Sequence, residues 1–331
     1  MSDDPNPRAG ILCAGTILVD AGKVIDAYPA LDHLTTIERI SLSTGGPALN
    51  MAVDLRMLGA AFPIGVLGAV GDDEHAAFIL AECARLGINT DGVRKLAGAV
   101  TSFTDVMVEK DGGRRTMFHH SGANALFDAS TAELETSAAR MLHTGAPGIH
   151  PFMDSRRPDG GNGWSALLQR GQAAGLHTNM ELVSLQPGRT AETALGCLPY
   201  LDSIVINELE AGALTGIDVS VPTADGPVDW PGIEAMALGL IERGVARIHL
   251  VNRSLDRAQA LAQRFGAAVM PAPSTSPVGV NPLVRASTMS PLVHSASAAP
   301  VRFGVLPLPS GEGAPVSALS GSIAPSGPRG V

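Results

Sequence analysis

Several residue types are scarce in this 331-residue chain, and each scarcity excludes a class of protein. The three cysteines, Cys13, Cys83 and Cys197, lie far apart and lack the spacing of a zinc site or a disulfide framework. No apolar run approaches the length that spans a bilayer. The first residues, MSDDPNPRAG, are polar and acidic, unlike a secretory signal peptide. We therefore expect a soluble, cytoplasmic protein.

Basic residues are also fewer than acidic ones, so the net charge is −9 at neutral pH. Such a balance disfavours contact with nucleic acid or with an anionic membrane surface. Hydrophobic residues make up 45% of the chain, which is enough for a sizeable core. We expect a globular protein whose partner is a small molecule, with no nucleic acid and no membrane.

The order of apolar runs predicts an α/β fold with a doubly wound parallel sheet. The run at 11–20 predicts a buried first strand that ends at Asp20. After residue 130, strands and helices alternate, beginning with a helix over 132–142, which is typical of parallel strands covered by helices. Segments 21–42 and 100–120 alternate with a period of two and predict a small separate β-sheet.

The C-terminal 271–331 segment has a different composition from the rest. It holds eleven of the 24 prolines, and its only charged residues are Arg285, Arg302, Glu312 and Arg329. Such a segment cannot bury an apolar face, so we expect it to be disordered. The predicted organisation is therefore one α/β domain over 1–270 followed by a low-complexity tail.

A glycine-rich turn precedes a predicted amphipathic helix in STGGPALNMAVDLRMLG, residues 43–59. Gly45 and Gly46 allow another molecule to approach the main chain closely, and Pro47 favours a helical first turn. A tight loop entering a packed helix explains the glycines equally well. It does not explain Asn50, which is a poor residue inside a helix.

This segment resembles the N-terminal signature of the ribokinase/PfkB family of sugar kinases. Further family features follow in order, and the resemblance covers roughly residues 10 to 250. The matching positions are Asp20, Gly45, Gly46, Asn50, the Gly68–Asp73 motif, Gly122 to Asn124, Asn179, Glu181, Asn207 and Glu210.

The resemblance implies a site for each substrate. A sugar would be bound by Asp20, Gly45, Gly46, Asn50, Asn124 and Glu181. ATP phosphates would lie near Asn207 and Glu210, with Glu210 holding a hydrated Mg²⁺. The small sheet would form a lid over the sugar, and a homodimer through that lid is a further expectation. Taken singly, Asp20 and Asn207 also fit caps of local turns, and Glu210 fits a solvated helix position.

The histidines add little to this prediction. His119 and His120 are adjacent on a predicted strand and must point to opposite faces. His143, His150 and His177 lie at strand ends without partner spacing, so we expect them to be structural.

The resemblance breaks near the C-terminus. The family needs a Gly-Ala-Gly-Asp sequence, whose amides form an anion hole and whose Asp is the general base, and the chain contains none. Residues 251–267 instead resemble the nucleotide-recognition turn of shikimate dehydrogenases, with Asn252, Arg253 and Arg257 in matching positions. The Gly-rich turn that such an NADP site requires one helix earlier is not found at the right spacing.

Two origins of this junction are open hypotheses, a gene fusion and a frameshift. One permissible back-translation of residues 281–293 yields PAGAGVDDVAAG in another reading frame. The leading prediction is a sugar kinase with impaired turnover. The alternatives are a non-catalytic sugar-binding protein on the same fold and an NADP-linked oxidoreductase.

Overall fold

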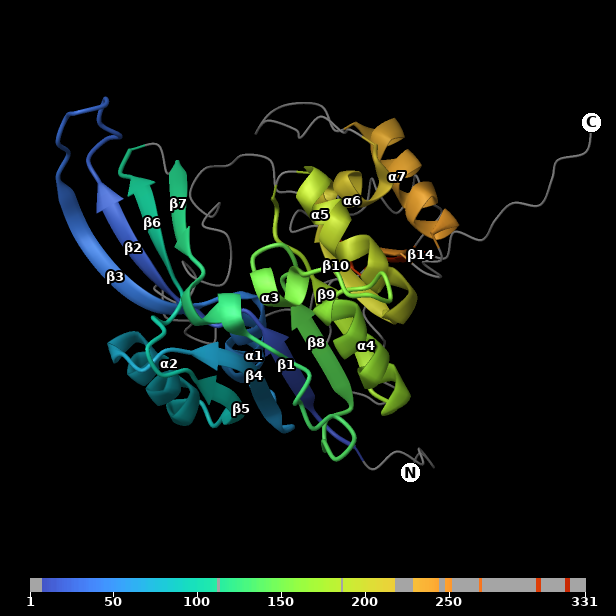
Figure 1. The fold of residues 1–331 in the computed structure, drawn as a ribbon. Coiled ribbons are helices and arrows are strands. Elements are labelled where there is room, and N and C mark those ends of the chain that lie inside the picture. Colours follow the sequence, from blue (N-terminus) through green and yellow to red (C-terminus); the bar gives the residue numbers. More distant parts are fainter. Residues whose placement is uncertain are drawn as a thin grey trace, which may run out of the picture. The chain divides into compact units, whose positions relative to one another are not determined.

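The computed structural model describes residues 8–111, 114–185, 187–217, 229–243, 248–251, 268–269, 302–304 and 319–321. These residues fall into two compact units, one reaching to Val183 and the other starting at Ser184 (Figure 1). Within these ranges, no helix is both long and apolar enough to cross a membrane.

The first unit contains a five-stranded parallel sheet in the order β9-β8-β1-β4-β5. This confirms the predicted α/β class. The edge strand β5 has the polar sequence NTDGVRK and was not predicted, because it carries no apolar run. The bounds are Ile11–Gly15 for β1, Ile64–Val70 for β4, Asn89–Lys95 for β5, Met141–Gly145 for β8 and His177–Glu181 for β9.

Helices cover both faces of this sheet, as in a doubly wound fold. The core on one face joins β1 and β4 to α1 (Pro47–Met57) and α2 (Glu74–Arg85), and Met141 of β8 packs against it. The next residue, Leu142, meets α4 (Gly163–Ala173) on the other face, where a Cβ at Gly171 would lie 2.8 Å from it. Two short helical segments, η1 (Gly122–Leu126) and α3 (Pro151–Asp154), complete the unit.

The apolar run at 11–20 forms two strands, so the prediction of one strand was wrong. The chain turns at Gly15, which has φ +126° and where a Cβ would lie 1.9 Å from the Gly145 carbonyl oxygen. After Thr16 and Ile17, the chain enters β2 (Leu18–Ile25) of a second sheet. Asp20 therefore lies within this second sheet and does not end the first strand of the main one.

The second sheet, called the lid sheet here, has the order β3-β2-β6-β7 (Figure 1). Its other strands are β3 (Ile37–Gly45), β6 (Phe103–Glu109) and β7 (Arg115–His120). This confirms the small sheet predicted from segments 21–42 and 100–120, with strand bounds shifted by a few residues. Residues 112 and 113, between β6 and β7, lie outside the described residues.

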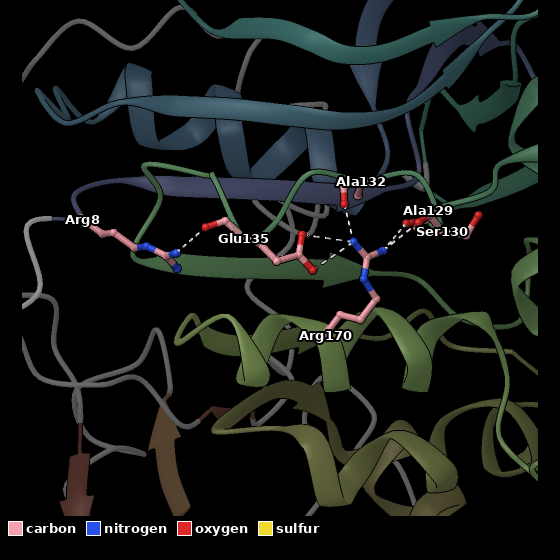
Figure 2. Close-up of polar contacts among 6 residues, drawn as sticks. All are labelled: Arg8, Ala129, Ser130, Ala132, Glu135 and Arg170. Carbon is pink, nitrogen blue, oxygen red and sulfur yellow. Dashed lines mark hydrogen bonds and ion pairs between the residues drawn. The ribbon is translucent and has the colours of Figure 1, made fainter.

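The helix predicted over 132–142 is not formed, because residues 127–140 are irregular up to the start of β8. Arg170 of α4 accounts for this. Its guanidinium donates to the carbonyl oxygens of Ala129, Ser130 and Ala132 and reaches the Glu135 carboxylate at 3.3 Å (Figure 2). Arg8 donates to the Glu135 carbonyl oxygen at 2.9 Å. These donors replace the amides that a helix would have supplied.

The second unit begins with α5 (Pro187–Ala194) and η2 (Leu195–Tyr200) and continues with the predicted strand–helix pair β10 (Ser203–Asn207) and α6 (Glu208–Thr215). The strand β13 (Arg302–Gly304) pairs antiparallel with both β10 and β11 (Ile248–Val251). The remaining elements are α7 (Trp230–Glu242), β12 (Ala268–Val269) and β14 (Leu319–Gly321).

Two of these short strands, β13 and β14, come from the predicted tail at 271–331. The rest of that segment lies outside the described residues, as do Asn252, Arg253 and Arg257. The domain boundary at residue 270 and the disorder of the tail stay predictions.

Candidate functional site

Strand pairing places the predicted sugar-binding acid in a row of polar side chains across the lid sheet. Asp20 of β2 lies opposite Ser43 of β3 and Thr104 of β6, and Thr104 lies opposite His119 of β7. Residues paired across strands share one face of a sheet. The Thr104 hydroxyl is 3.1 Å from Nδ1 of His119 and hydrogen-bonds the Asp20 carboxylate.

Gly45 allows the Asp20 carboxylate to lie directly against the main chain of β3. A Cβ at Gly45 would be 2.3 Å from Oδ2 of Asp20, so any side chain there would displace the carboxylate. Burial raises the pKa of Asp20 to about 6, while the Arg115 charge and the Thr104 hydrogen bond act in the opposite direction. The carboxylate is thus held partly desolvated beside the diglycine.

The start of α1 lies at the end of β3. Gly46 is its N-cap residue, with φ 92° and ψ 141°, and no side chain caps the first turn. A Cβ at Gly46 would lie 2.5 Å from the Thr16 carbonyl oxygen, so this turn requires glycine. One turn further on, Oδ1 of Asn50 is buried and has no hydrogen-bond partner among the described residues.

Asn124 is hydrogen-bonded to the short segment that joins β1 of the main sheet to β2 of the lid sheet. Its side chain is fully buried, Nδ2 donates to the Ile17 carbonyl oxygen at 3.0 Å, and Oδ1 accepts from the Ile17 amide at 3.4 Å. This pairing explains the amide side chain at this position by structure alone. Its predicted contact with sugar stays a prediction.

Glu181 lies at the end of β9 beside a buried histidine. Its Oε2 is 3.8 Å from Nε2 of His143, whose Nδ1 is 2.6 Å from Oδ1 of Asn179. Burial lowers the pKa of His143 to about 4, so the imidazole is neutral at physiological pH. The sequence predicted structural roles for the histidines but gave no sign that His143 contacts a candidate site residue.

The six predicted sugar-binding residues gather in one part of the first unit. Gly45, Gly46 and Asn50 surround the start of α1, and Asp20 lies against Gly45. A Cβ at Gly145 would lie 2.8 Å from Cβ of Pro47 and 3.0 Å from the Glu181 carbonyl oxygen, which puts the end of β9 beside the same turn. Asn124 contacts Ile17, just before β2.

In the second unit, Asn207 and Glu210 form a capping box at the start of α6. Oδ1 of Asn207 accepts from the Glu210 amide at 2.9 Å, and Oε2 of Glu210 accepts from the Asn207 amide at 3.0 Å. Oε1 of Glu210 also accepts from the Ser184 hydroxyl at 2.9 Å. Asn207 is therefore a helix cap, whereas Glu210 is buried and not the solvated residue that the alternative supposed.

The donors present limit how a metal ion could bind here. Within the described ranges, no three His, Cys, Asp or Glu side chains are placed to hold a metal ion together. Oε1 of Glu210 already accepts two hydrogen bonds, from the Ser184 hydroxyl and from Nδ2 of Asn207, and Oε2 accepts one from the Asn207 amide. This suits a contact to the water shell of Mg²⁺, which the ion keeps readily, better than direct coordination.

Sequence reasoning missed Arg115 and Thr104, which both act on Asp20. A signal was available for the first of these. Arg115 and His119 are four residues apart in RTMFHH and therefore lie on one face of the strand.

Comparisons with known proteins agree with the fold and with the family resemblance. The model of the pfkB family carbohydrate kinases matches residues 9–279. The chain is 27% identical over 206 residues to an ATP-dependent ribose-1-phosphate kinase of Halopiger xanaduensis, covering 62% of this chain and 63% of that protein. The ribokinase structure from Giardia lamblia superposes with TM-score 0.56 at 19% identity, covering 72% of this chain and 68% of the other.

A second similarity covers a shorter stretch of the chain and is to a different class of enzyme. The chain is 50% identical over 66 residues to a shikimate dehydrogenase of Nitrobacter hamburgensis, covering 18% of this chain and 23% of that protein. The chain thus spans less than two thirds of the curated relatives it matches. Because the family model extends over most of the chain and the fold agrees with it, the chain belongs to the pfkB family of carbohydrate kinases.

Proposed function

We propose that the first unit binds a sugar at the Asp20 row and the start of α1. The observation that carries this proposal is the buried amide oxygen Oδ1 of Asn50, which has no hydrogen-bond donor among the described residues. The partly desolvated carboxylate of Asp20 in the same unit supports it. A buried acceptor without a donor costs free energy, and a hydroxyl group supplies the missing donor. A sugar presents several such hydroxyls, and the ionised Asp20 can accept from two of them.

We propose that the hydroxyl is phosphorylated from ATP in relatives with a complete C-terminal region and that this chain transfers slowly. Two similar proteins support ATP as the phosphoryl donor. The Halopiger relative is ATP-dependent, and an Arabidopsis thaliana ribokinase structure contains ribose and ATP. Asn207 and Glu210 would order the start of α6 near the phosphates, with Glu210 contacting a hydrated Mg²⁺. That ion would neutralise phosphate charge when bound.

Slow transfer follows from the missing Gly-Ala-Gly-Asp sequence. General-base assistance is typically worth about 10²–10⁴ in rate, and one donor to the transferring group is worth a similar factor. This chain has neither the general base nor the donor that this motif supplies. A protein that binds sugar without phosphorylating it is therefore the limiting case of the same proposal.

Isothermal titration calorimetry with a sugar panel, with and without ATP and Mg²⁺, tests sugar binding. We expect one sugar to bind, and Asp20→Ala to weaken its affinity about 100-fold through loss of charge-assisted hydrogen bonds. Asp91→Ala is the matched control, because Asp91 is exposed on the edge strand β5. Equal affinities for wild type and Asp20→Ala would remove Asp20 from the site.

We also propose that the lid sheet forms a homodimer through the face opposite Asp20. Ile40, Leu42 and Phe118 lie on that face with exposed fractions of 64%, 51% and 58%. Sedimentation analysis should show a dimer, which Leu42→Asp dissociates. A monomer at all accessible concentrations would refute this arrangement.

An NADP-linked oxidoreductase is the second candidate, favoured only by the short similarity to shikimate dehydrogenases. Enhancement of NADPH fluorescence on adding protein would support it. The absence of enhancement, together with sugar binding, would leave the kinase-like function.

A further inference from the structure

The Gly68–Asp73 segment joins β4 to α2 and has no part in either proposed substrate site. A Cβ at Gly68 would lie 2.4 Å from Cδ1 of Ile17, and a Cβ at Gly71 would lie 2.2 Å from the Ala99 carbonyl oxygen. Ile17 lies between β1 and β2, and Ala99 lies between β5 and β6, so both belong to connections between the main sheet and the lid sheet. The segment therefore packs against the base of the lid sheet at two places.

The carboxylate of Asp73 ties the start of α2 to one of these connections. Asp73 is the N-cap residue of α2, and its Oδ1 accepts from the Ala76 amide at 2.9 Å. Oδ1 also accepts from the Thr101 hydroxyl at 2.6 Å, and Oδ2 accepts from the Thr101 amide at 2.7 Å. Burial acts to raise the pKa of Asp73, but the hydrogen bonds from Thr101 and Ala76 hold it below its ordinary value of 3.8. The group is therefore ionised at neutral pH.

Thr101 lies three residues before Thr104, which hydrogen-bonds the Asp20 carboxylate. The Ser102 carbonyl oxygen accepts from the Val19 amide at 3.1 Å, where the pairing of β6 with β2 begins. That pairing places Thr104 opposite Asp20. Strand register determines which side chains face one another, so a change in the position of Thr101 shifts Thr104 relative to Asp20.

We propose that Asp73 is a positioning residue for the sugar site. By binding Thr101 it holds the start of β6, and β6 in turn holds Thr104 against the Asp20 carboxylate. This inference rests on the proposed sugar-binding function and adds to it a residue that acts through the lid sheet and does not itself contact the sugar. A helix cap alone would need only the contact with Ala76 and would not require both Thr101 donors.

NMR titration of the Asp20 carboxyl group in the full chain tests the inference without a ligand. Its signal is identified by its loss in Asp20→Asn. Burial raises the pKa of Asp20 to about 6, and the hydrogen bond from Thr104 lowers it. We therefore expect Thr104→Val to raise this pKa further, and Asp73→Asn to raise it as well.

Asp73→Asn separates positioning from capping. Asn keeps one oxygen for the Ala76 amide and is as good an N-cap residue as Asp, but it has no second oxygen for the Thr101 amide. Thr101→Val removes only the hydroxyl contact and leaves the cap intact, so it should raise the pKa of Asp20 by less. Asn162→Ala is the matched control, because Asn162 caps α4 through the Ser165 amide. It should lower the unfolding temperature and leave the pKa of Asp20 unchanged.

Calorimetry with the sugar that binds wild type completes the test. At pH 8 we expect Asp73→Asn to weaken the affinity about three- to tenfold and Asn162→Ala to leave it within about twofold. The inference is overturned if the pKa of Asp20 stays at its wild-type value in Asp73→Asn and Thr101→Val, or if Asn162→Ala shifts it equally. If the pKa shifts as expected but no sugar binds wild type, the placement of Asp73 stands and the proposed function fails.

Discussion

Asp20 lies where burial disfavours the ionised form of its carboxyl group. It lies against Gly45 in a partly desolvated position, and Thr104 and Arg115 only partly offset the burial of its charge. An ionised carboxyl group in such a position is less stable than the same group in the unfolded chain. In the proposed function, hydroxyl donors of a bound sugar would offset part of this desolvation cost.

Asp20→Asn should therefore stabilise the protein at high pH. The pKa of Asp20 is about 6 in the folded protein, above its ordinary value of 3.8. The folded state then binds more protons between these values, so stability present below pH 3.8 is lost as pH rises through 6. We expect Asp20→Asn to raise the free energy of unfolding by on the order of 2–3 kcal/mol at pH 8 and by little at pH 4.

Urea denaturation at the two pH values measures this difference. Asp91→Asn on the exposed edge strand is the control and should change neither value. Destabilisation by Asp20→Asn at pH 8 would contradict the burial that the structure assigns to Asp20.

His143 should make the protein sensitive to acid. Its pKa is about 4 in the folded protein, below its ordinary value of 6.5. The unfolded chain binds the extra proton first, so stability is full above pH 6.5 and is lost as pH falls toward 4. The loss from this group is at most about 3 kcal/mol. His143→Gln should flatten the pH dependence of unfolding over that range, whereas the exposed His33→Gln should not; identical slopes would refute the assignment.

At the scale of elements, hydrogen-bond donors from a distant side chain determine the conformation of residues 127–140, which the local sequence pattern predicted incorrectly. The pattern over 132–142 predicts a helix, yet residues 127–140 are irregular, and three of their carbonyl oxygens are bound by the single guanidinium of Arg170 (Figure 2). The donor comes from α4, some 40 residues later in the chain. Local periodicity contains no information about such a partner.

Arg170→Ala should destabilise the first unit by about 2–4 kcal/mol, because the part-buried carbonyl oxygens of Ala129 and Ala132 and the exposed one of Ser130 lose their donor together. Thermal or urea unfolding measures this change. Arg85→Ala is the control, since Arg85 of α2 forms only an exposed pair with Glu82 and should cost less than about 1 kcal/mol. Equal effects of the two substitutions would show that the guanidinium does not hold the segment.

At the scale of the whole molecule, the question is whether the chain completes a catalytic cycle. We expect purified protein to consume ATP at background level when sugar is added, because the general base of the family motif is absent. Replacing the residues after Leu250 with the corresponding segment of a complete pfkB family kinase should restore sugar-dependent turnover. The same replacement with its catalytic Asp changed to Asn is the control. Strong sugar phosphorylation by the unaltered chain would refute impaired turnover and require another base.

The sequence by itself determined the α/β class, the separate small sheet and the helix after the diglycine. These follow from local periodicity and from backbone angles that only glycine adopts readily. Motif order also identified Asp20 and Asn207 as residues of interest. Asn207 and Glu210 proved to cap each other, which is a local contact visible in their spacing.

Only the tertiary structure decided where Asp20 lies and what surrounds it. The turn at Gly15 requires glycine because the Gly145 carbonyl oxygen, 130 residues later, leaves no room for a side chain. That turn moves Asp20 from the main sheet to the lid sheet, beside Thr104 and within reach of Arg115. Strand pairing over such separations sets which charges meet. A linear pattern fixes the period of each strand but not its neighbour, so the effects of Thr104 and Arg115 on Asp20 became visible only in the folded chain.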